Sequence, residues 1–230
     1  MSLLRRASLG TSILSRTLGP WPFLLVLVWC LVTKLQEPSF FARQNVPFYW
    51  ASVEAVLVAT VGLLPLVWRL SLGFEASRYT LRRAASPLDQ VGAIWLSHVA
   101  YGGIVLGVGL ATAVGVECIT LQSISSVPWA GLLDAAGASA ACLLVCSSLA
   151  PALALQPGST PAVACLWLMV LACLLQFFLP SAGAELAGEL SESSRTPFAP
   201  RAPSGILSGL LATLGGLAVS LAHAYHRLRH

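Results

Sequence analysis

The sequence predicts an all-α, polytopic membrane protein with about six transmembrane helices in a single membrane domain spanning residues 1–230. Of its residues 57% are hydrophobic and only 10% are charged, whereas a soluble domain carries roughly 25% charged residues. The mean hydropathy is +0.80, and the apolar residues gather in long runs, as in membrane-spanning helices. A separate folded domain of ordinary size would leave too little chain for the spans, so we expect one membrane domain.

Six apolar runs, bounded by charged or proline-containing segments, are the expected spans. They lie at about 21–35, 47–68, 91–116, 128–149, 161–179 and 205–225. The first run is short for a bilayer core of ~30 Å, which takes about 20 helical residues. Aromatic residues at the ends of the second run, namely Phe48, Tyr49, Trp50 and Trp68, are expected to form belts at the membrane interfaces.

Residues 1–19 form a basic lead-in with Arg5, Arg6 and Arg16 and no acidic residue. Leucines interspersed with serine and threonine favour an amphipathic helix at the membrane interface, retained on the cytoplasmic side. A transit peptide and a signal peptide are the alternatives for such a start.

Two longer polar segments separate the spans, at residues 69–90 and 180–204. With six spans, both termini and the 69–90 segment lie on one side, and this side carries roughly nine of the 13 Lys and Arg residues. The positive-inside rule then makes that side cytoplasmic, with N-in and C-in topology. The 180–204 segment, which contains three glutamates, becomes an external loop.

The net charge of +4 does not indicate nucleic-acid binding, because the cations flank apolar runs and form no patch interleaved with aromatics. The six cysteines show neither C-x-x-C nor Cys/His ligand spacing, so we expect small apolar packing residues and no metal site.

Three polar residues fall inside predicted spans: Glu54, His98 and Asp134. Ionisable residues in lipid are costly and commonly face a bundle interior or a cavity. A role in a transport pathway stands beside structural hydrogen bonding for Glu54 and Asp134. His98 is either a ligand or proton carrier or a polar residue near the cytoplasmic interface.

A stripe of small residues runs down the third predicted span, at every fourth position. It comprises Gly103, Gly107, Ala111 and Gly115. Such a stripe lets another helix approach closely, either within one bundle or between two.

The segment between the second and third predicted spans carries the most specific motif. It contains Phe74 and Glu75, then Arg78-Tyr79-Thr80-Leu81, then Ser86-Pro87-Leu88. With six spans and a basic start, this order resembles the ABC-2-type transporter permeases, in which Gly stands where this chain has Tyr79. Overall size and a span at the C-terminus are similar to the B subunit of the haem exporter of cytochrome c maturation.

The resemblance implies a permease subunit in the cell (inner) membrane that pairs with a second permease subunit as a homo- or heterodimer. It also implies a separate ATP-binding cassette subunit. The one lysine, Lys34, lies in no glycine-rich phosphate loop, so we expect ATP–Mg to bind the partner and this chain not to be an enzyme. Docking would use the cytoplasmic segment through Phe74, Glu75, Arg78, Tyr79, Leu81, Arg82 and Arg83.

Three alternatives remain at this stage. The arginines of the 69–90 segment also suit anchoring at anionic lipid headgroups, without any docking. The whole chain also suits a non-transporting membrane assembly or scaffold protein. A third hypothesis is an ion- or proton-coupled carrier that uses Glu54 and Asp134.

Overall fold

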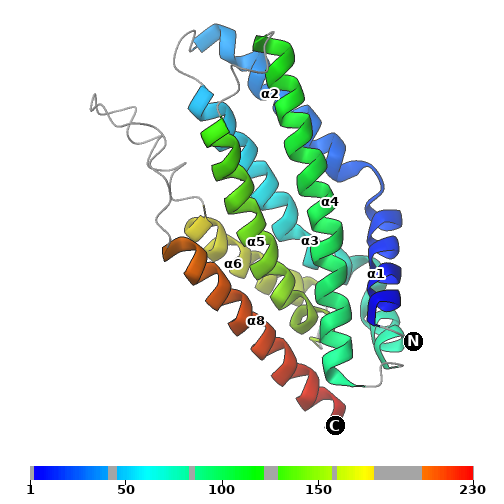
Figure 1. Ribbon diagram of the computed structural model, residues 1–230. Helices are drawn as coiled ribbons and strands as arrows, with labels where there is room; N and C mark the ends of the chain where they lie inside the picture. The colour runs from blue at the N-terminus through cyan, green and yellow to red at the C-terminus, as the bar shows by residue number, and fades with distance from the viewer. Residues whose placement is uncertain are drawn as a thin grey trace.

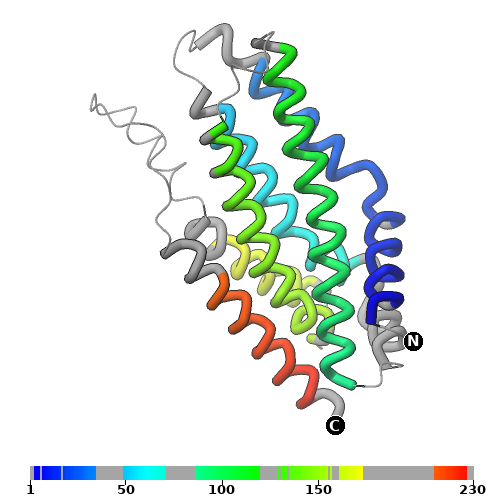
Figure 2. The backbone as a smooth tube through the Cα atoms, viewed as in Figure 1, coloured from blue at the N-terminus to red at the C-terminus, as the bar shows by residue number. Residues whose placement is uncertain are grey.

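The computed structural model describes residues 3–40, 46–82, 86–121, 129–156, 160–178 and 204–229, and these are helical apart from short turns (Figures 1 and 2). The helices are α1 (Leu3–Leu18), α2 (Trp21–Phe40), α3 (Val46–Arg82), α4 (Pro87–Leu121), α5 (Trp129–Leu155), α6 (Thr160–Phe178) and α8 (Ser204–Arg229). The described part contains no strand, and the prediction of an all-helical fold is confirmed.

Three of these helices are long and apolar enough to cross a membrane. Their apolar stretches are Tyr49–Leu70, Pro87–Ile119 and Gly131–Ala154. The bent pair Leu3–Arg16 and Trp21–Lys34 makes a fourth if it counts as one span, and α6 and α8 contain shorter apolar stretches. The chain therefore has the helices of a membrane protein, and six spans remain a prediction.

Helices α3, α4 and α5 form the centre of the bundle. Helix α6 packs on α3, α8 packs mainly on α5, and both α1 and α2 pack on α4 (Figure 1). The start of α1, the end of α3, the start of α4 and the end of α8 all lie toward the same end of the bundle. Lys34, Tyr49 and Glu117, described below, lie at the opposite end.

The bend between α1 and α2 has a local cause in the sequence. Gly19 has a φ of 52°, the left-handed conformation that glycine adopts without a Cβ penalty and that commonly ends a helix. Its N–H donates to Ser15 O at 2.9 Å, and Pro20 then suits the first turn of the next helix. The two helices consequently meet at an angle of 55°.

Helix α4 begins at a well-formed cap. The Asp89 N–H donates to Ser86 Oγ at 3.1 Å, Pro87 occupies the first helical position, and Asp89 places a negative charge in the first turn. Serine as N-cap, proline at the first position and an acid in the first turn each favour a helix start.

Two helix ends differ from the sequence expectation. Helix α3 continues without a break through Arg82, so the first part of the polar segment expected at 69–90 continues the second predicted span as one helix. Helix α4 continues through Leu121, and Glu117, expected in a loop after residue 116, lies inside it. Charged residues had been taken as span ends, whereas the helices extend past them.

Where side chains are described, the aromatic residues expected in interfacial belts face the inside of the bundle, and their depth in a membrane stays a prediction. Tyr49, Trp50 and Trp68 are all buried in the bundle. Tyr49 and Trp50 are in edge-to-face contact, with ring centroids 5.5 Å apart. Their large apolar surfaces fill the spaces between helices, where aromatic side chains contribute most to packing.

Several helix contacts carry a buried hydrogen bond from a side chain of one helix to the backbone of the other. Ser97 Oγ of α4 donates to Ala7 O of α1 at 3.0 Å, and Trp167 Nε1 of α6 donates to Gly62 O of α3 at 2.9 Å. Ser220 Oγ of α8 donates to Ser148 O of α5 at 2.7 Å, and the Tyr49 hydroxyl of α3 donates to Ala113 O of α4 at 2.9 Å. Because lipid supplies no hydrophobic drive for helix association, such hydrogen bonds and close packing hold a membrane bundle together.

The glycines that allow close approach are not those of the predicted stripe. A Cβ on Gly102 would lie 2.2 Å from Leu143 Cδ1 of α5. A Cβ on Gly103, Gly107 or Gly115 would meet no described atom within 4 Å. Within the described bundle the stripe is therefore not a packing surface, which corrects that half of the prediction; packing between two bundles stays a prediction.

We expect Gly102→Val to lower the free energy of unfolding by about 2 kcal/mol, since the added methyl groups must displace Leu143. Gly103→Val is the matched control, because it makes the same change in helix propensity one residue away with open space around it. Thermal unfolding of both purified variants in detergent measures the difference. Equal losses in the two variants would contradict the observed rotation of α4.

Candidate intramembrane polar site

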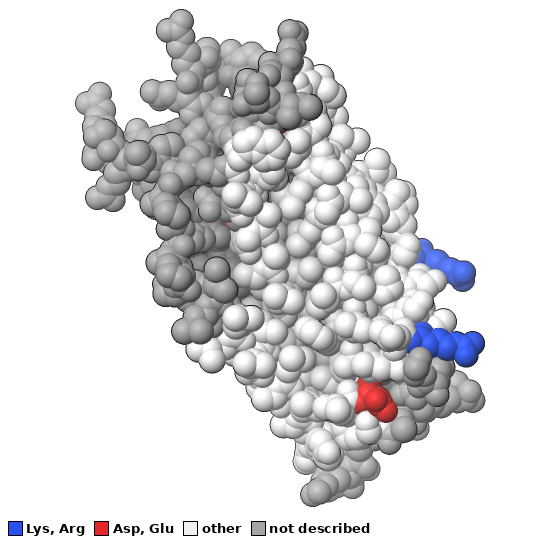
Figure 3. Space-filling view, viewed as in Figure 1, with Lys and Arg blue, Asp and Glu red and all other residues white. Residues whose placement is uncertain are grey.

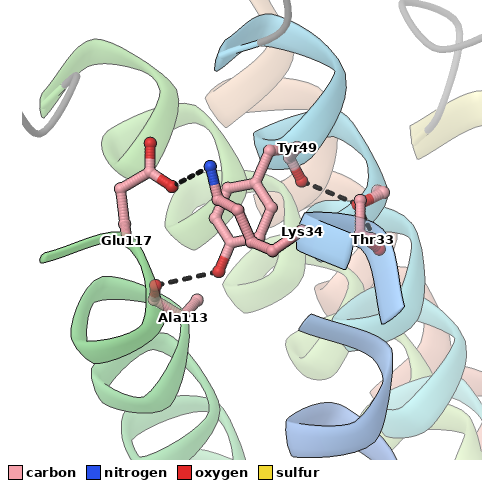
Figure 4. A network of polar contacts seen from close by, with 6 residues as sticks. Thr33, Lys34, Tyr49, Ala113 and Glu117 are labelled. Carbon is pink, nitrogen blue, oxygen red and sulfur yellow. Dashed lines mark hydrogen bonds and ion pairs between the residues drawn. The ribbon is translucent and has the colours of Figure 1, made fainter. Parts of the chain in front are cut away.

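The strongest polar feature of the described bundle is a buried ion pair between α2 and α4. Lys34 Nζ lies 2.5 Å from Glu117 Oε2 (Figure 4). Glu117 is fully buried, and Lys34 is only 9% exposed. Apolar helices surround both residues, so each charge interacts with the other and not with water.

Tyr49 of α3 joins this pair to a third helix. The Lys34 ammonium lies 4.3 Å from the centroid of the Tyr49 ring, a distance suited to a cation–π contact. The Tyr49 hydroxyl donates to Ala113 O at 2.9 Å, one turn before Glu117 on α4. Helices α2, α3 and α4 are thus tied together at one level (Figure 4).

Two hydroxyl residues extend the network beside Lys34. Thr33 Oγ1 donates to Trp29 O at 2.8 Å within α2. Ser52 Oγ of α3 donates to Tyr49 O at 2.8 Å and lies 3.4 Å from Thr33 Oγ1. These contacts place α2 against the first turns of α3.

The electrostatics of the site make its two charges interdependent. A buried ion pair gains from its Coulomb attraction but has lost hydration, so removal of one partner leaves a charge without compensation. Glu117 Oε1 has no hydrogen-bond partner among the described residues and is buried. The carboxylate therefore has spare acceptor capacity, which is the chemistry needed to take up a proton or a small cation.

The predicted intramembrane residues do not all join this site. Glu54 is buried in α3 at 6% exposure and engages a partner. Asp134 lies on α5, and its side chain is outside the described residues. The pair of acids singled out from the sequence is therefore not seen to converge, and Glu117 takes the central position.

His98 is packed inside the bundle between α4 and α3. It is fully buried in α4, with Nδ1 2.8 Å from Ile94 O and its ring 5.0 Å from the Trp68 ring of α3. Its Nε2 has no hydrogen-bond partner in the described part of the chain. His98 therefore packs between helices, with one ring nitrogen unpartnered among the described residues, and both of its predicted roles stay predictions.

Arg69, which begins the predicted cytoplasmic segment, belongs to the bundle as well. It is 2% exposed, and its Nη1 donates to Ala154 O near the end of α5 at 3.3 Å. Gln90, at the other end of the same segment, is buried too. The solvent-facing part of this segment is therefore shorter than residues 69–90.

The residues predicted to dock a partner lie on α3 and beyond it. Phe74, Glu75, Arg78, Tyr79, Leu81 and Arg82 belong to the last turns of α3, and their side chains are outside the described ones. Arg83 lies outside the described residues. Their role stays a prediction.

The described ranges contain no cluster of metal ligands. No group of three or more His, Cys, Asp or Glu residues there is arranged to hold an ion. Cys142 and Cys146 contact each other with sulfurs 3.7 Å apart on successive turns of α5, and Cys142 also contacts Val58 O of α3. They act as packing residues.

The sequence did hold a signal for the missed site. Glu117 is followed by Cys118, Ile119 and Leu121, so the apolar character resumes after it. Lys34 likewise follows an apolar run with a single threonine between. Two isolated opposite charges at the ends of apolar runs indicate a buried pair, because each alone would be costly in lipid.

No protein-family model, no curated protein and no solved structure matches this chain. The class rests on the fold: an all-helical membrane protein with three long apolar helices, or four with the bent pair, among its described residues.

We expect Glu117→Gln and Lys34→Met each to lower the free energy of unfolding by about 3 kcal/mol, because each leaves the opposite charge buried without its partner. The double variant Lys34→Met/Glu117→Gln should lose much less than the sum. Denaturant titration of the purified variants in detergent measures this coupling, with Arg16→Gln as a control that removes an exposed charge. Additive losses would show that the two side chains are independent.

Proposed function

We propose that the chain is a membrane-spanning permease subunit of an ABC-2-like exporter, energised by a separate ATP-binding subunit. The observation that carries the proposal is the form of α3. This helix leaves its apolar stretch at Leu70 and continues to Arg82, about 18 Å further at the helical rise. A span that extends as one continuous helix into a polar, arginine-containing end can transmit movement of a partner to the bundle.

The arrangement of the helix ends supports the proposed topology. The start of α1, the end of α3, the start of α4 and the end of α8 lie toward one end of the bundle (Figure 1), and most of the arginines lie in or between these segments. Anionic cytoplasmic surfaces retain such segments. In this proposal α6 and α8 supply the fifth and sixth spans, each with help from residues beyond its shorter apolar stretch, in the cell (inner) membrane.

The position of Lys34 inside the bundle supports a separate ATPase. It is the one lysine of the chain, and it is engaged with Glu117 inside the bundle. A phosphate-binding loop requires its lysine at the end of a glycine-rich turn. ATP–Mg is therefore assigned to the partner subunit.

The outward stripe of α4 supports pairing with a second permease subunit. Gly103, Gly107 and Ala111 are exposed and flanked by the exposed Ile104 and Val108. Small residues beside aliphatic ones allow two helices from different subunits to pack closely in lipid. A homo- or heterodimer in which α4 faces its counterpart follows from this arrangement.

We expect Phe74→Ala/Leu81→Ala to reduce co-purification of an ATP-binding subunit with the tagged chain from its native membranes by about tenfold, since apolar anchors dominate docking sites. Leu210→Ala/Leu211→Ala is the matched control, because it removes two exposed apolar side chains on α8. The ATPase activity and mass-spectrometric composition of the eluate provide the measurement. Unchanged association in the first variant would refute docking at the tip of α3.

A second candidate function is an ion- or proton-coupled carrier. It is favoured by Glu117, which is buried with one carboxylate oxygen unpartnered among the described residues. Glu54, five residues after Tyr49 on α3, is a second buried carboxylate. Buried carboxylates of this kind bind protons or cations in membrane carriers.

For the carrier, Glu54→Gln, Asp134→Asn and Glu117→Gln are each expected to abolish ion or proton flux into liposomes that contain the purified chain. Flux of a pH-sensitive or ion-sensitive dye reports the outcome, and Thr112→Val serves as a control on the exposed side of α4. Full flux in the three variants would exclude the carrier.

A further inference from the structure

A groove opens between α1, α2 and α4, on the side of the bundle away from α5 and α6. It has a volume of about 420 Å³. One wall is a row of α1 hydroxyl groups, namely Ser8, Thr11, Ser12 and Ser15. The other wall is formed by Phe23 of α2 with Tyr101 and Ile104 of α4. The groove is thus hydroxyl-rich on one side and apolar on the other.

Tyr101 gives this groove a polar group that the protein leaves unused. The residue is 3% exposed, it lines the groove, and its hydroxyl has no hydrogen-bond partner among the described residues. A buried hydroxyl without a partner is costly, so a ligand that offers an acceptor at this point is favoured.

Positive charge flanks the groove along α1. Arg5 and Arg16 are exposed on the same helix, three residues before Ser8 and four after Ser12, so they lie close to its hydroxyl row. Figure 3 shows separate basic groups along the edge of the molecule where α1 lies, with an acidic group below them and mostly uncharged described atoms on the rest of this face. The charge therefore favours an anionic occupant.

The surface beyond the groove is apolar. Ile104 and Val108 of α4 and Leu24 and Val28 of α2 are all exposed. A ligand with a polar, anionic head and hydrocarbon tails matches both parts: the head and its esters meet hydroxyls and arginines, and the tails lie over exposed aliphatic side chains.

We propose that this groove is a binding site for one anionic phospholipid of the surrounding bilayer. Its phosphate is held by Arg5, its glycerol and ester oxygens meet the α1 hydroxyl row and Tyr101, and its acyl chains run along α2 and α4. Arg16, about 16 Å further along α1, adds electrostatic attraction for the anionic head. The site requires only that the chain lies in a membrane. It is independent of the carrier and of an ATP-binding subunit. On α4 it uses Ile104 and Val108, which the proposed permease pairing also uses, so the lipid and a second permease subunit exclude each other there.

The test is native mass spectrometry of the full chain in neutral detergent, titrated with phosphatidylglycerol or with phosphatidylcholine of the same acyl chains. We expect one phosphatidylglycerol to bind at least tenfold more tightly than phosphatidylcholine. Arg5→Gln/Arg16→Gln should weaken phosphatidylglycerol binding by about 30-fold and remove the preference. Arg195→Gln/Arg201→Gln, which removes the same charge elsewhere, should leave it unchanged.

Two further variants test the groove itself. Ser12→Trp should fill it and abolish tight binding of either lipid, whereas Leu9→Trp on the neighbouring exposed side of α1 should not. Tyr101→Phe should weaken binding by about fivefold through loss of one hydrogen bond, with no change in the unfolding temperature.

Three results would overturn the proposal. These are equal binding of the two lipids by the unaltered chain, an equal effect of the two arginine double variants, and tight phosphatidylglycerol binding by a folded Ser12→Trp variant. Self-association of the chain that Ser12→Trp disrupts, in the absence of lipid binding, would assign the groove to a second copy instead.

Discussion

A charge that leaves water for the interior of an apolar helix bundle must find its counter-charge there, and the pair of Lys34 and Glu117 satisfies this condition. Each residue alone would be expensive at its position, and together they bring the end of α2 to the end of α4. Tyr49 adds α3 to the same level through its ring and its hydroxyl. The position of α2 in the bundle depends on this contact, since few other polar ties hold it within the described residues.

The two ends of the bundle carry different chemistry. The end with the ion pair is closed by buried contacts among three helices, whereas the opposite end gathers the start of α1 and the extension of α3 past its apolar stretch. Arg69 and His98 brace this second end from inside through Ala154 and Trp68. In the proposed exporter subunit, this division would provide a packed bundle and a polar helix end for a partner to contact. The lipid groove beside α1 would let membrane composition influence the same end.

Composition and apolar runs predicted the helical class and the approximate place of each helix, because both follow from the solvent that surrounds the chain. Composition and apolar runs did not predict how each helix is rotated about its axis. The small-residue stripe of α4 was recognised, yet Gly102, one residue away, contacts Leu143 while Gly103 faces outward; one residue is 100° of rotation, and only neighbouring helices fix it. The Lys34–Glu117 pair was missed because the two residues lie far apart in the chain. Lys34 was placed at the end of the first predicted span (21–35), and the third predicted span was ended at residue 116, just before Glu117. Trp68 and Arg69 were placed at the end of a span from their residue types alone. In the structure α5 covers Arg69, whose guanidinium donates to Ala154 O.

The most direct measurement of this account is the free energy of unfolding of the exchange variant Lys34→Glu/Glu117→Lys, compared in detergent with the two single charge reversals. Each single reversal places two like charges together in the bundle and is expected to prevent stable folding or to lower stability by several kcal/mol, about 4 at least. The exchange restores opposite charges across the same helix contact, so we expect it to recover most of that loss. An exchange variant as unstable as the single reversals would contradict the central role of the pair.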